Sequence, residues 1–265
     1  MNTIELRPVG IVRSADDSTA EMPLQGKTSV IEICPEYAAA LERIGEYSHL
    51  WILSWFHEAK RDVLATVPSK VNPDLPRYGV FALRTPMRPN PIALTLVTLE
   101  RVSDDGRLYV SGLDAVNGTP VLDIKPYFEQ DIVFSPRSPD IRPVIREIRR
   151  KLMEKEALNH HREICMDLRI AVRMCLIAEA AFGRLDDDSL QVEAAGSGCL
   201  GDVIQCLTRA RLANPARFGF RSSRDAASST WVKSGTRLFI EFVGSVDMPD
   251  WDAIPDEELF RVKGG

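Results

Sequence analysis

Apolar and polar positions alternate with a short period through the first half of the chain. Residues 4–13 and 28–34 alternate in this way, the second range with many β-branched residues, so each predicts a strand. The continuous apolar run 50–56, which contains two tryptophans, predicts a buried central strand. Further strands are predicted over 79–83, 92–102, 107–113 and 121–124, with a hairpin turn at 104–106.

The predicted strands are short and are separated by frequent turns. Residues 35–44 begin with a proline and have a period near 3.6, so they predict one short helix. Residues 62–77 contain three prolines and predict a loop. This pattern is typical of a β-barrel or a β-sandwich. We therefore expect a mainly β N-terminal domain with a short helix.

The second half of the chain mixes helical and strand patterns. Helices are predicted over 144–159 and 166–182, and a third begins at Asp202, placed as its capping residue. Residues 196–201 predict a glycine-rich turn, and strands are predicted over 190–194, 218–222, 230–233 and 236–242. Prolines and charges between 135 and 143 indicate a boundary. We expect a barrel domain over 1–138 and an α+β domain over 139–265.

Composition narrows the class of protein. The 265 residues are 45% hydrophobic and 27% charged, which is typical of a globular protein and excludes a disordered chain. The sequence has no apolar run of about 18 residues and no signal-peptide pattern at its start, so we expect no membrane partner. Five cysteines, an odd number, disfavour a disulfide framework and favour a reducing, cytoplasmic location.

The charge balance bears on the substrate. The net charge is −5, and residues 1–145 hold 19 acidic against 15 basic side chains. A protein that neutralises several phosphates usually presents a basic face. Composition alone therefore does not favour a nucleic-acid substrate.

The proline-rich stretch 81–92 is the strongest candidate for a site. Three prolines fix their own φ angles and restrict the residues that precede them. The loop can therefore hold Arg84, Arg88 and Asn90 in fixed directions, as a site for a polar ligand requires. The alternative is a rigid turn whose arginines pair with surface acids.

The same stretch carries a resemblance to a known family. Together with motifs that occur in the family's order, it resembles the TrmO-like family of tRNA adenine-37 N6-methyltransferases. The resemblance spans roughly residues 4–130, about half the chain. The other motifs lie at 10–14, 31–32, 35–37, 47–52, 55–57, 79–82, 112–114 and 118–127. It implies a β-barrel fold, S-adenosylmethionine as cofactor, tRNA as substrate and a homodimer with a shared cofactor site.

The resemblance also implies residue roles. The cofactor-binding positions that match are Gln25, His57, Glu58, Arg84, Leu94, Asn117, Gly118, Thr119 and Pro120. The glycine fingerprint of βαβ nucleotide-binding units is absent from the sequence, so the cofactor would bind in another way. We assign substrate binding to Arg88, Asn90 and Lys125. An exocyclic amine loses a proton on methylation, and Asp123 and Tyr127 are the candidate acceptors.

Several of these positions have structural alternatives. His57 can be a core histidine, Asp123 and Lys125 can form a surface ion pair, and Asp114 can stabilise the turn that follows it. Two departures from the family also bear on the substrate. The family usually has arginine where this chain has Leu24, and often a polar or aromatic residue where it has Met87. The first departure weakens the case for tRNA more than that for the cofactor.

A second group of candidate residues lies in the C-terminal half. His161, Cys165 and Cys199 are good ligands for zinc or another soft metal, with Cys206 as a further candidate. The region 158–240 resembles the E-like domain family of formylmethanofuran dehydrogenase. Glu163 replaces a histidine of that family, Met166 and Asp167 replace Pro-Gly, and Ala210 replaces its last cysteine. The alternative is a degenerate domain whose cysteines act as small hydrophobic residues.

These observations lead to three competing functions. The first is an S-adenosylmethionine-dependent methyltransferase that modifies N6 of threonylcarbamoyl-modified adenosine 37 in tRNA. The alternative is a methyltransferase of the same fold that acts on a small molecule or a metal-linked thiol held by the C-terminal domain. The third is a non-catalytic sensor of a metal or cofactor. A homodimer is expected because the exposed edge of a small barrel needs cover.

Overall fold

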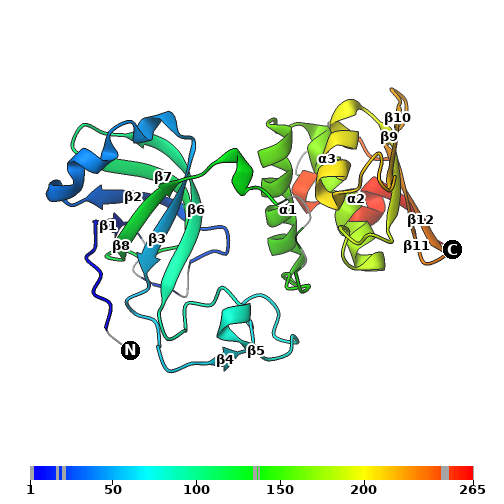
Figure 1. Ribbon diagram of the computed structural model, residues 1–265. Coiled ribbons are helices and arrows are strands. Elements are labelled where there is room, and N and C mark those ends of the chain that lie inside the picture. Colours follow the sequence, from blue (N-terminus) through cyan, green and yellow to red (C-terminus); the bar gives the residue numbers. More distant parts are fainter. Residues whose placement is uncertain are drawn as a thin grey trace. The chain divides into compact units, whose positions relative to one another are not determined.

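The computed structural model describes residues 3–15, 18–19, 22–133, 136, 138–245 and 251–264 (Figure 1). Its internal contacts divide the chain into two units, Met1–Val133 and Phe134–Gly265. The predicted boundary segment, 135–143, begins just after this division, and its residues 135 and 137 lie outside the described residues. The domain limits at 138 and 139 stay a prediction.

Six strands of the first unit form a closed barrel, in the order β1-β2-β7-β6-β3-β8. Every neighbouring pair is antiparallel. Inward side chains alternate with outward ones, as in the burial of every second residue of β3. The predicted barrel is confirmed. The strands are β1 (Gly10–Arg13), β2 (Lys27–Ile33), β3 (His49–Trp55), β6 (Ile92–Val102), β7 (Arg107–Leu113) and β8 (Pro120–Pro126).

The barrel core is made of aliphatic side chains from all six strands. The fully buried members include Val12, Ile31, Leu50, Ile52, Val97, Leu108, Val110, Leu113 and Val121. The expectation that the tryptophan strand is buried on both faces is wrong, because Trp51 and Trp55 lie on its outer side and are only half-buried. The apolar run therefore reflects an apolar outer face as well as a core.

The hairpin between β6 and β7 matches its prediction. Both strand ranges agree with the predicted limits. Gly106 has φ +78°, and its N–H donates to the Ser103 carbonyl at 3.1 Å. A positive φ is readily adopted by glycine, so the Asp-Asp-Gly sequence was a reliable turn signal.

Other local predictions in the first unit are wrong. The strand predicted over 4–13 covers only the four residues of β1. The predicted helix is two short 3-10 helices, η1 (Pro35–Leu41) and η2 (Ile44–Glu46). The strand predicted over 79–83 is instead a 3-10 turn, η3 (Val80–Ala82). The preceding pair β4 (Ala65–Thr66) and β5 (Tyr78–Gly79) belongs to the long excursion between β3 and β6.

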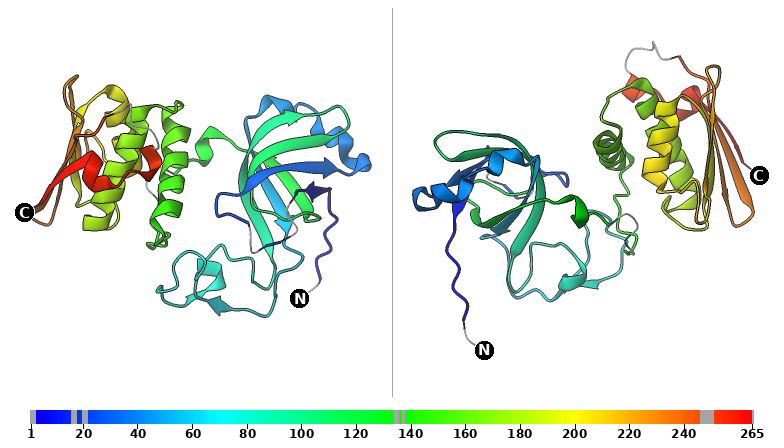
Figure 2. Two further views of the ribbon diagram at one scale, coloured as in Figure 1. Left: turned by 180° about the vertical axis from the view of Figure 1, so that it is seen from behind. Right: turned by 45° about the horizontal axis from the view of Figure 1, so that its top comes forward.

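The second unit is a five-stranded sheet with helices on one face, as Figures 1 and 2 show. The strand order is β10-β9-β11-β12-β13, with β10 parallel to β9 and the other pairs antiparallel. This arrangement confirms the predicted α+β class. The strands are β9 (Gln191–Gly196), β10 (Phe218–Ser222), β11 (Ser228–Lys233), β12 (Thr236–Phe242) and β13 (Phe260–Gly264).

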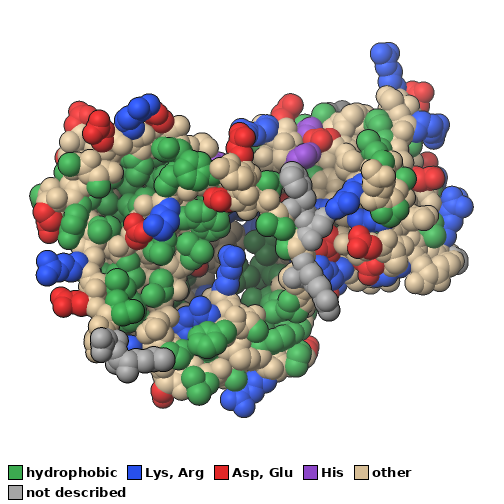
Figure 3. Space-filling model, in the orientation of Figure 1, with side chains coloured by type: hydrophobic (Ala, Val, Ile, Leu, Met, Phe, Trp, Pro, Cys, Tyr) green, Lys and Arg blue, Asp and Glu red, His purple; other side chains and the backbone are tan. Residues whose placement is uncertain are grey.

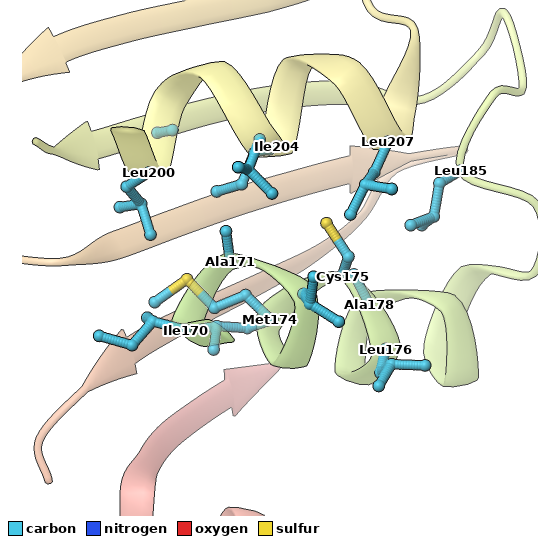
Figure 4. Packing of buried hydrophobic residues seen from close by; sticks show 14 of the residues in the cluster. Ile170, Ala171, Met174, Cys175, Leu176, Ala178, Leu185, Leu200, Ile204 and Leu207 are labelled. Carbon is cyan, nitrogen blue, oxygen red and sulfur yellow. The ribbon is translucent and has the colours of Figure 1, made fainter. Parts of the chain in front are cut away.

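Three helices build the core of this unit. They are α1 (Arg146–His161), α2 (Met166–Phe182) and α3 (Gly198–Thr208). Helix α2 packs against β11 and β12, α3 packs against β9 and β10, and α1 contacts both helices. Figure 4 shows Leu200, Ile204 and Leu207 of α3 facing side chains of α2 that include Ala171 and Cys175.

The start of α3 differs from its prediction. The helix begins at Gly198, and the Ser197 Oγ caps it by accepting a hydrogen bond from the Leu200 N–H at 3.1 Å. The predicted turn over 196–201 and the capping role of Asp202 are therefore wrong. Gly201 explains the glycines in part, because a Cβ there would lie 2.5 Å from the Phe220 ring.

The end of the chain adds elements that the sequence pattern did not predict. These are β13, the single turn α4 (Asp256–Leu259) and the 3-10 turn η5 (Trp251–Ala253). Within the described part of the chain, the helices are too short or too polar to cross a membrane.

Candidate functional site

The strand register places most of the predicted cofactor residues at one end of the barrel. Trp55, at the end of β3, pairs with Ile92 at the start of β6. Ser54 pairs with Val121 near the start of β8, and Lys27 at the start of β2 pairs with the last residue of β7. We call this end the rim. The loops that reach it carry Gln25, His57, Glu58, Arg84, Asn117, Gly118, Thr119 and Pro120.

The two arginines of the proline-rich loop have different surroundings. The Arg88 Nη2 donates to the carbonyl oxygens of Val80 and Leu83, and its Nε is buried without a hydrogen-bond partner. Arg84 is exposed and makes no hydrogen bond or ion pair with the described residues. The rigid-turn alternative therefore fits Arg88, whereas the Arg84 guanidinium is available for a ligand.

A third arginine, which the sequence reasoning missed, anchors the same loop. Arg61 Nε donates to the Pro89 carbonyl at 3.0 Å, and its guanidinium carbon lies 5.3 Å from the centre of the Trp55 ring. The Phe56 N–H donates to the Pro91 carbonyl at 2.9 Å. These contacts tie the loop to the end of β3, so its shape does not depend on the prolines alone. Asn90 in this loop is exposed.

The turn before β8 is tied to β1. The Gly118 N–H donates to the Val12 carbonyl, and the Val12 N–H donates to the Thr119 carbonyl, both at 2.9 Å. Thr119 is fully buried, and its Oγ1 donates to the Val116 carbonyl at 2.8 Å. The side chain of Thr119 is thus structural, and the turn can offer a ligand the backbone and the exposed Asn117.

His57 and Glu58 stand next to each other on the rim. Their side chains are 37% and 53% exposed, and Nε2 of the histidine lies 3.9 Å from the Glu58 Oε1. The alternative of a core histidine is therefore wrong. Gln25 is half-buried and precedes Gly26, whose N–H donates to the Pro23 carbonyl at 3.1 Å.

Asp123 and Leu94 lie on the outer face of the barrel, close to the rim. Both pair with Leu53 of β3, from opposite sides. The Asp123 Oδ2 accepts from Lys125 Nζ at 2.7 Å, and both side chains are about half exposed. The alternative of a surface ion pair is thereby confirmed for Asp123 and Lys125. Such an exposed pair contributes little to stability and leaves the carboxylate accessible.

Tyr127 lies toward the other end of the barrel. Its N–H donates to the carbonyl of His49, the first residue of β3, at 3.1 Å, and its ring centre lies 6.0 Å from that of Trp51. Along a strand, each residue advances about 3.3 Å, so His49 and Trp55 are separated by roughly 20 Å. The two candidate proton acceptors therefore do not share one place, and Asp123 is the one near the rim.

Asp114 has the structural role that was its alternative. Its Oδ1 accepts a hydrogen bond from the Thr95 Oγ1 at 2.5 Å, which links the end of β7 to β6. Leu24, which stands where the resembled family usually has arginine, is 40% exposed.

The three predicted metal ligands of the second unit lie together. His161 ends α1, Cys165 caps the start of α2, and Cys199 is in the first turn of α3. One ligand atom from each lies within 4.8 Å of the others. The expectation that His161 and Cys165 share the first turns of α2 is wrong, since a left-handed residue, Arg162 at φ 67°, ends α1 between them.

Hydrogen bonds and burial set the ionisation of this group. Burial of Asp202 opposes its ionisation, but hydrogen bonds from His161 and His160 hold the pKa of its carboxyl below the ordinary value. Burial, together with the neighbouring Cys165, raises the pKa of the Cys199 thiol. The expected lowering by the helix N-terminus therefore does not dominate.

Asp202 belongs to this group, although the sequence pattern indicated a capping role for it. Its Oδ2 lies 2.7 Å from the Nδ1 of His161, and its Oδ1 lies 2.9 Å from the Nε2 of His160. Once α3 is known to begin at Gly198, Cys199 and Asp202 are three residues apart on a helix and share a face. That spacing was the available signal.

Comparison with known proteins places the chain among related sequences. The family model of the tRNA-methyltransferase O N-terminal domain matches residues 11–131. A probable S-adenosyl-L-methionine-binding protein of Archaeoglobus fulgidus is 37% identical over 91% of this chain and 68% of its own length. This share is too large for either unit alone. The human tRNA (adenine(37)-N6)-methyltransferase is 45% identical over 36% of this chain and 21% of its own length.

A solved structure gives a further comparison. The crystal structure of TrmO from Pseudomonas aeruginosa is 23% identical and covers 98% of this chain and 97% of that chain, with a TM-score of 0.44.

Proposed function

We propose, from the premise that the chain belongs to the tRNA-methyltransferase O N-terminal domain family, that it methylates N6 of threonylcarbamoyl-modified adenosine 37 in tRNA. The chain is an S-adenosylmethionine-dependent methyltransferase, and the acceptor is the proposed part. The observation that carries the proposal is the family match over residues 11–131, which includes the whole barrel and every loop of the rim.

The residues of the rim fit the chemistry of S-adenosylmethionine. The cofactor carries a carboxylate, an amine, a sulfonium and an adenine. Arg84 is exposed and without a protein partner among the described residues, so it can bind the carboxylate. The exposed Glu58 carboxylate can face the amine. The backbone of the turn at Asn117 and Gly118, held in place by β1, can meet the adenine.

When bound, the cofactor supplies an activated methyl group, so the protein's main contribution is to position the acceptor. The acceptor nitrogen must also lose a proton. Asp123 lies near the rim on the outer face and is half exposed, so its carboxylate is placed to accept this proton. Asn90, in the anchored loop, and Lys125, paired with Asp123, are available to the acceptor. We assign the supporting role of Arg88 to the loop itself.

Analysis of modified nucleosides tests this function. The full chain is incubated with tRNA that carries threonylcarbamoyl-adenosine but lacks the methyl group, with isotope-labelled S-adenosylmethionine, and the tRNA is then digested for liquid chromatography and mass spectrometry. We expect label in the methylated nucleoside. Arg84→Ala should lose most of the product. Arg43→Ala should not, because Arg43 is exposed, pairs with Glu46 and precedes the opposite end of β3. Absence of label with correctly folded protein and confirmed cofactor binding would refute the tRNA acceptor.

A second candidate acceptor is a small molecule or metal-linked thiol held by the C-terminal unit. Two observations favour it. Three metal-ligating atoms converge in that unit, and the first 145 residues carry an excess of acidic side chains. In the same assay, unlabelled tRNA together with label in an added thiol would support this candidate. Label in tRNA alone would reject it.

We also propose a homodimer, on grounds other than a free strand edge. The barrel is closed, so it leaves no such edge to cover. Instead, the outer face of β6 exposes Ile92, Leu94 and Leu96, beside the half-buried tryptophans of β3. Figure 3 shows hydrophobic side chains gathered over the barrel unit on the face in view.

Light scattering tests this assembly. We expect a dimer mass at micromolar concentration, and Leu96→Glu should give a monomer because it places a charge on the apolar face. Ile4→Glu is the matched control, since Ile4 is 83% exposed and lies outside the barrel strands. A monomer mass for the unchanged protein would refute the dimer.

A cytoplasmic location is proposed on the same footing. All five cysteines have free thiols, and two of them, Cys165 and Cys199, lie close together. A reducing compartment keeps such thiols unpaired.

A further inference from the structure

Three helix ends of the C-terminal unit bring a histidine and two cysteines to one point. Their ligand atoms lie within 4.8 Å of one another, and the Sγ of Cys165 is 3.5 Å from the Nε2 of His161. A tetrahedral zinc ion with Zn–S near 2.3 Å and Zn–N near 2.0–2.1 Å separates its nitrogen and sulfur ligands by about 3.6 Å. The histidine and the first cysteine thus already stand at the separation that a shared ion requires.

Asp202 prepares the histidine for this role. Its Oδ2 lies 2.7 Å from the Nδ1 of His161, so the carboxylate holds the proton on Nδ1 and leaves the Nε2 lone pair directed at the two thiols. The other carboxylate oxygen is 2.9 Å from the Nε2 of His160. The His161 side chain is only 9% exposed, so its ring has little freedom to turn away.

The remaining cysteines do not belong to this group. Cys206 lies on the same helix as Cys199 but seven residues further on, which is about 10 Å along the axis. Cys175 is fully buried in the core among aliphatic side chains. The group is therefore selective for two of the five thiols, and Cys206 provides a matched control.

We propose that His161, Cys165 and Cys199 bind one zinc-class divalent ion, with Asp202 as the positioning residue and the fourth coordination position open to an exogenous thiolate. Among the described residues, no further histidine, cysteine or carboxylate joins the three within the same distance. Three protein ligands with an open position are typical of catalytic and ligand-binding zinc sites rather than structural ones. This proposal concerns the C-terminal unit and does not rest on the proposed tRNA acceptor.

Metal content is the first test. The full chain is loaded with zinc, passed through a desalting column, and analysed for metal and protein. We expect close to one zinc per chain, which Cys165→Ser and Cys199→Ser should each lose and Cys206→Ser should keep. Asp202→Asn should keep the fold but lower the zinc affinity roughly 10- to 100-fold, as expected for a group that orients a metal-binding histidine. Less than a tenth of a zinc per chain in folded, reduced protein would overturn the proposal.

Cobalt substitution tests the ligand set without any variant. Co²⁺ bound by two thiolates and an imidazole should give a thiolate charge-transfer band in the near ultraviolet and visible bands typical of four-coordination. Titration with a small thiol, 2-mercaptoethanol, should then shift the visible bands if the fourth position accepts it. Binding of cobalt without a charge-transfer band would refute the cysteine ligands, and unchanged visible bands on addition of the thiol would refute the open position.

Discussion

Arg173 connects helix α2 to the last elements of the C-terminal unit, and its removal gives a sharp test of how that unit is stabilised. The residue is 8% exposed. Its Nε donates to the Asp256 Oδ1 at 2.7 Å, and its two terminal nitrogens donate to the carbonyl oxygens of Trp251 at 3.2 Å and Ile254 at 2.6 Å. One side chain therefore satisfies a carboxylate and two carbonyl groups.

The expected cost follows from what Arg173→Met leaves behind. Methionine keeps part of the aliphatic stem, but the Asp256 carboxylate and both carbonyl groups lose their donor. Removing one partner of a buried ion pair costs about 3–5 kcal/mol, because the remaining charge is left uncompensated. For a unit of this size, such a loss lowers the melting temperature by roughly 10 °C or more.

Arg146→Met is the matched control, because Arg146 pairs with the same carboxylate. The Arg146 side chain is 48% exposed, against 10% for that of Arg173. An exposed pair contributes about 0–1 kcal/mol, so this variant should melt close to the unchanged protein. Differential scanning calorimetry of the full chain measures both variants. Equal shifts of the two would refute the reasoning that burial, rather than the ion pair itself, sets the cost.

Three further predictions concern other parts of the chain. Leu50→Ala should destabilise the barrel by about 2–5 kcal/mol in denaturant titration, because Leu50 is fully buried in its core. Gly201→Ala should cost about 1–3 kcal/mol in the same measurement, since the Phe220 ring must move to make room for a methyl group. The Asp186 pKa is lowered by its hydrogen bonds from Arg184, so this pair stabilises the fold above the ordinary carboxyl pKa near 4 and loses that effect as the pH falls through the lowered value; melting curves at decreasing pH should therefore show less acid sensitivity in Asp186→Asn.

The sequence predicted the strands best where turn chemistry and alternation agreed. The β6–β7 hairpin was predicted at its observed limits because a glycine with positive φ marks its turn. The segment 79–83 failed because an apolar run of five residues does not distinguish a strand from a 3-10 turn. In that turn, the carbonyls of Val80 and Leu83 are satisfied by Arg88, a contact that a local pattern cannot reveal.

The candidate cofactor residues could be gathered into one place only with the strand register. Their positions in the sequence span nearly a hundred residues, and no local signal says which loops meet. The pairing of Trp55 with Ile92, and of Lys27 with Leu113, brings those loops to a common rim. The same register separates Asp123 from Tyr127, which the sequence offered as equal candidates.

The C-terminal group shows what residue type can predict and what it cannot. Histidine and cysteine were recognisable as soft-metal ligands from their side chains alone. Their helices were recognisable from periodicity, but the start of α3 was placed four residues too late, so Asp202 was assigned to a cap. With the helix beginning at Gly198, the end of α1, the start of α2 and the first turn of α3 bring their side chains together. Asp202 then stands behind the histidine rather than beside the metal position, which makes its substitution a test of orientation and not of ligation.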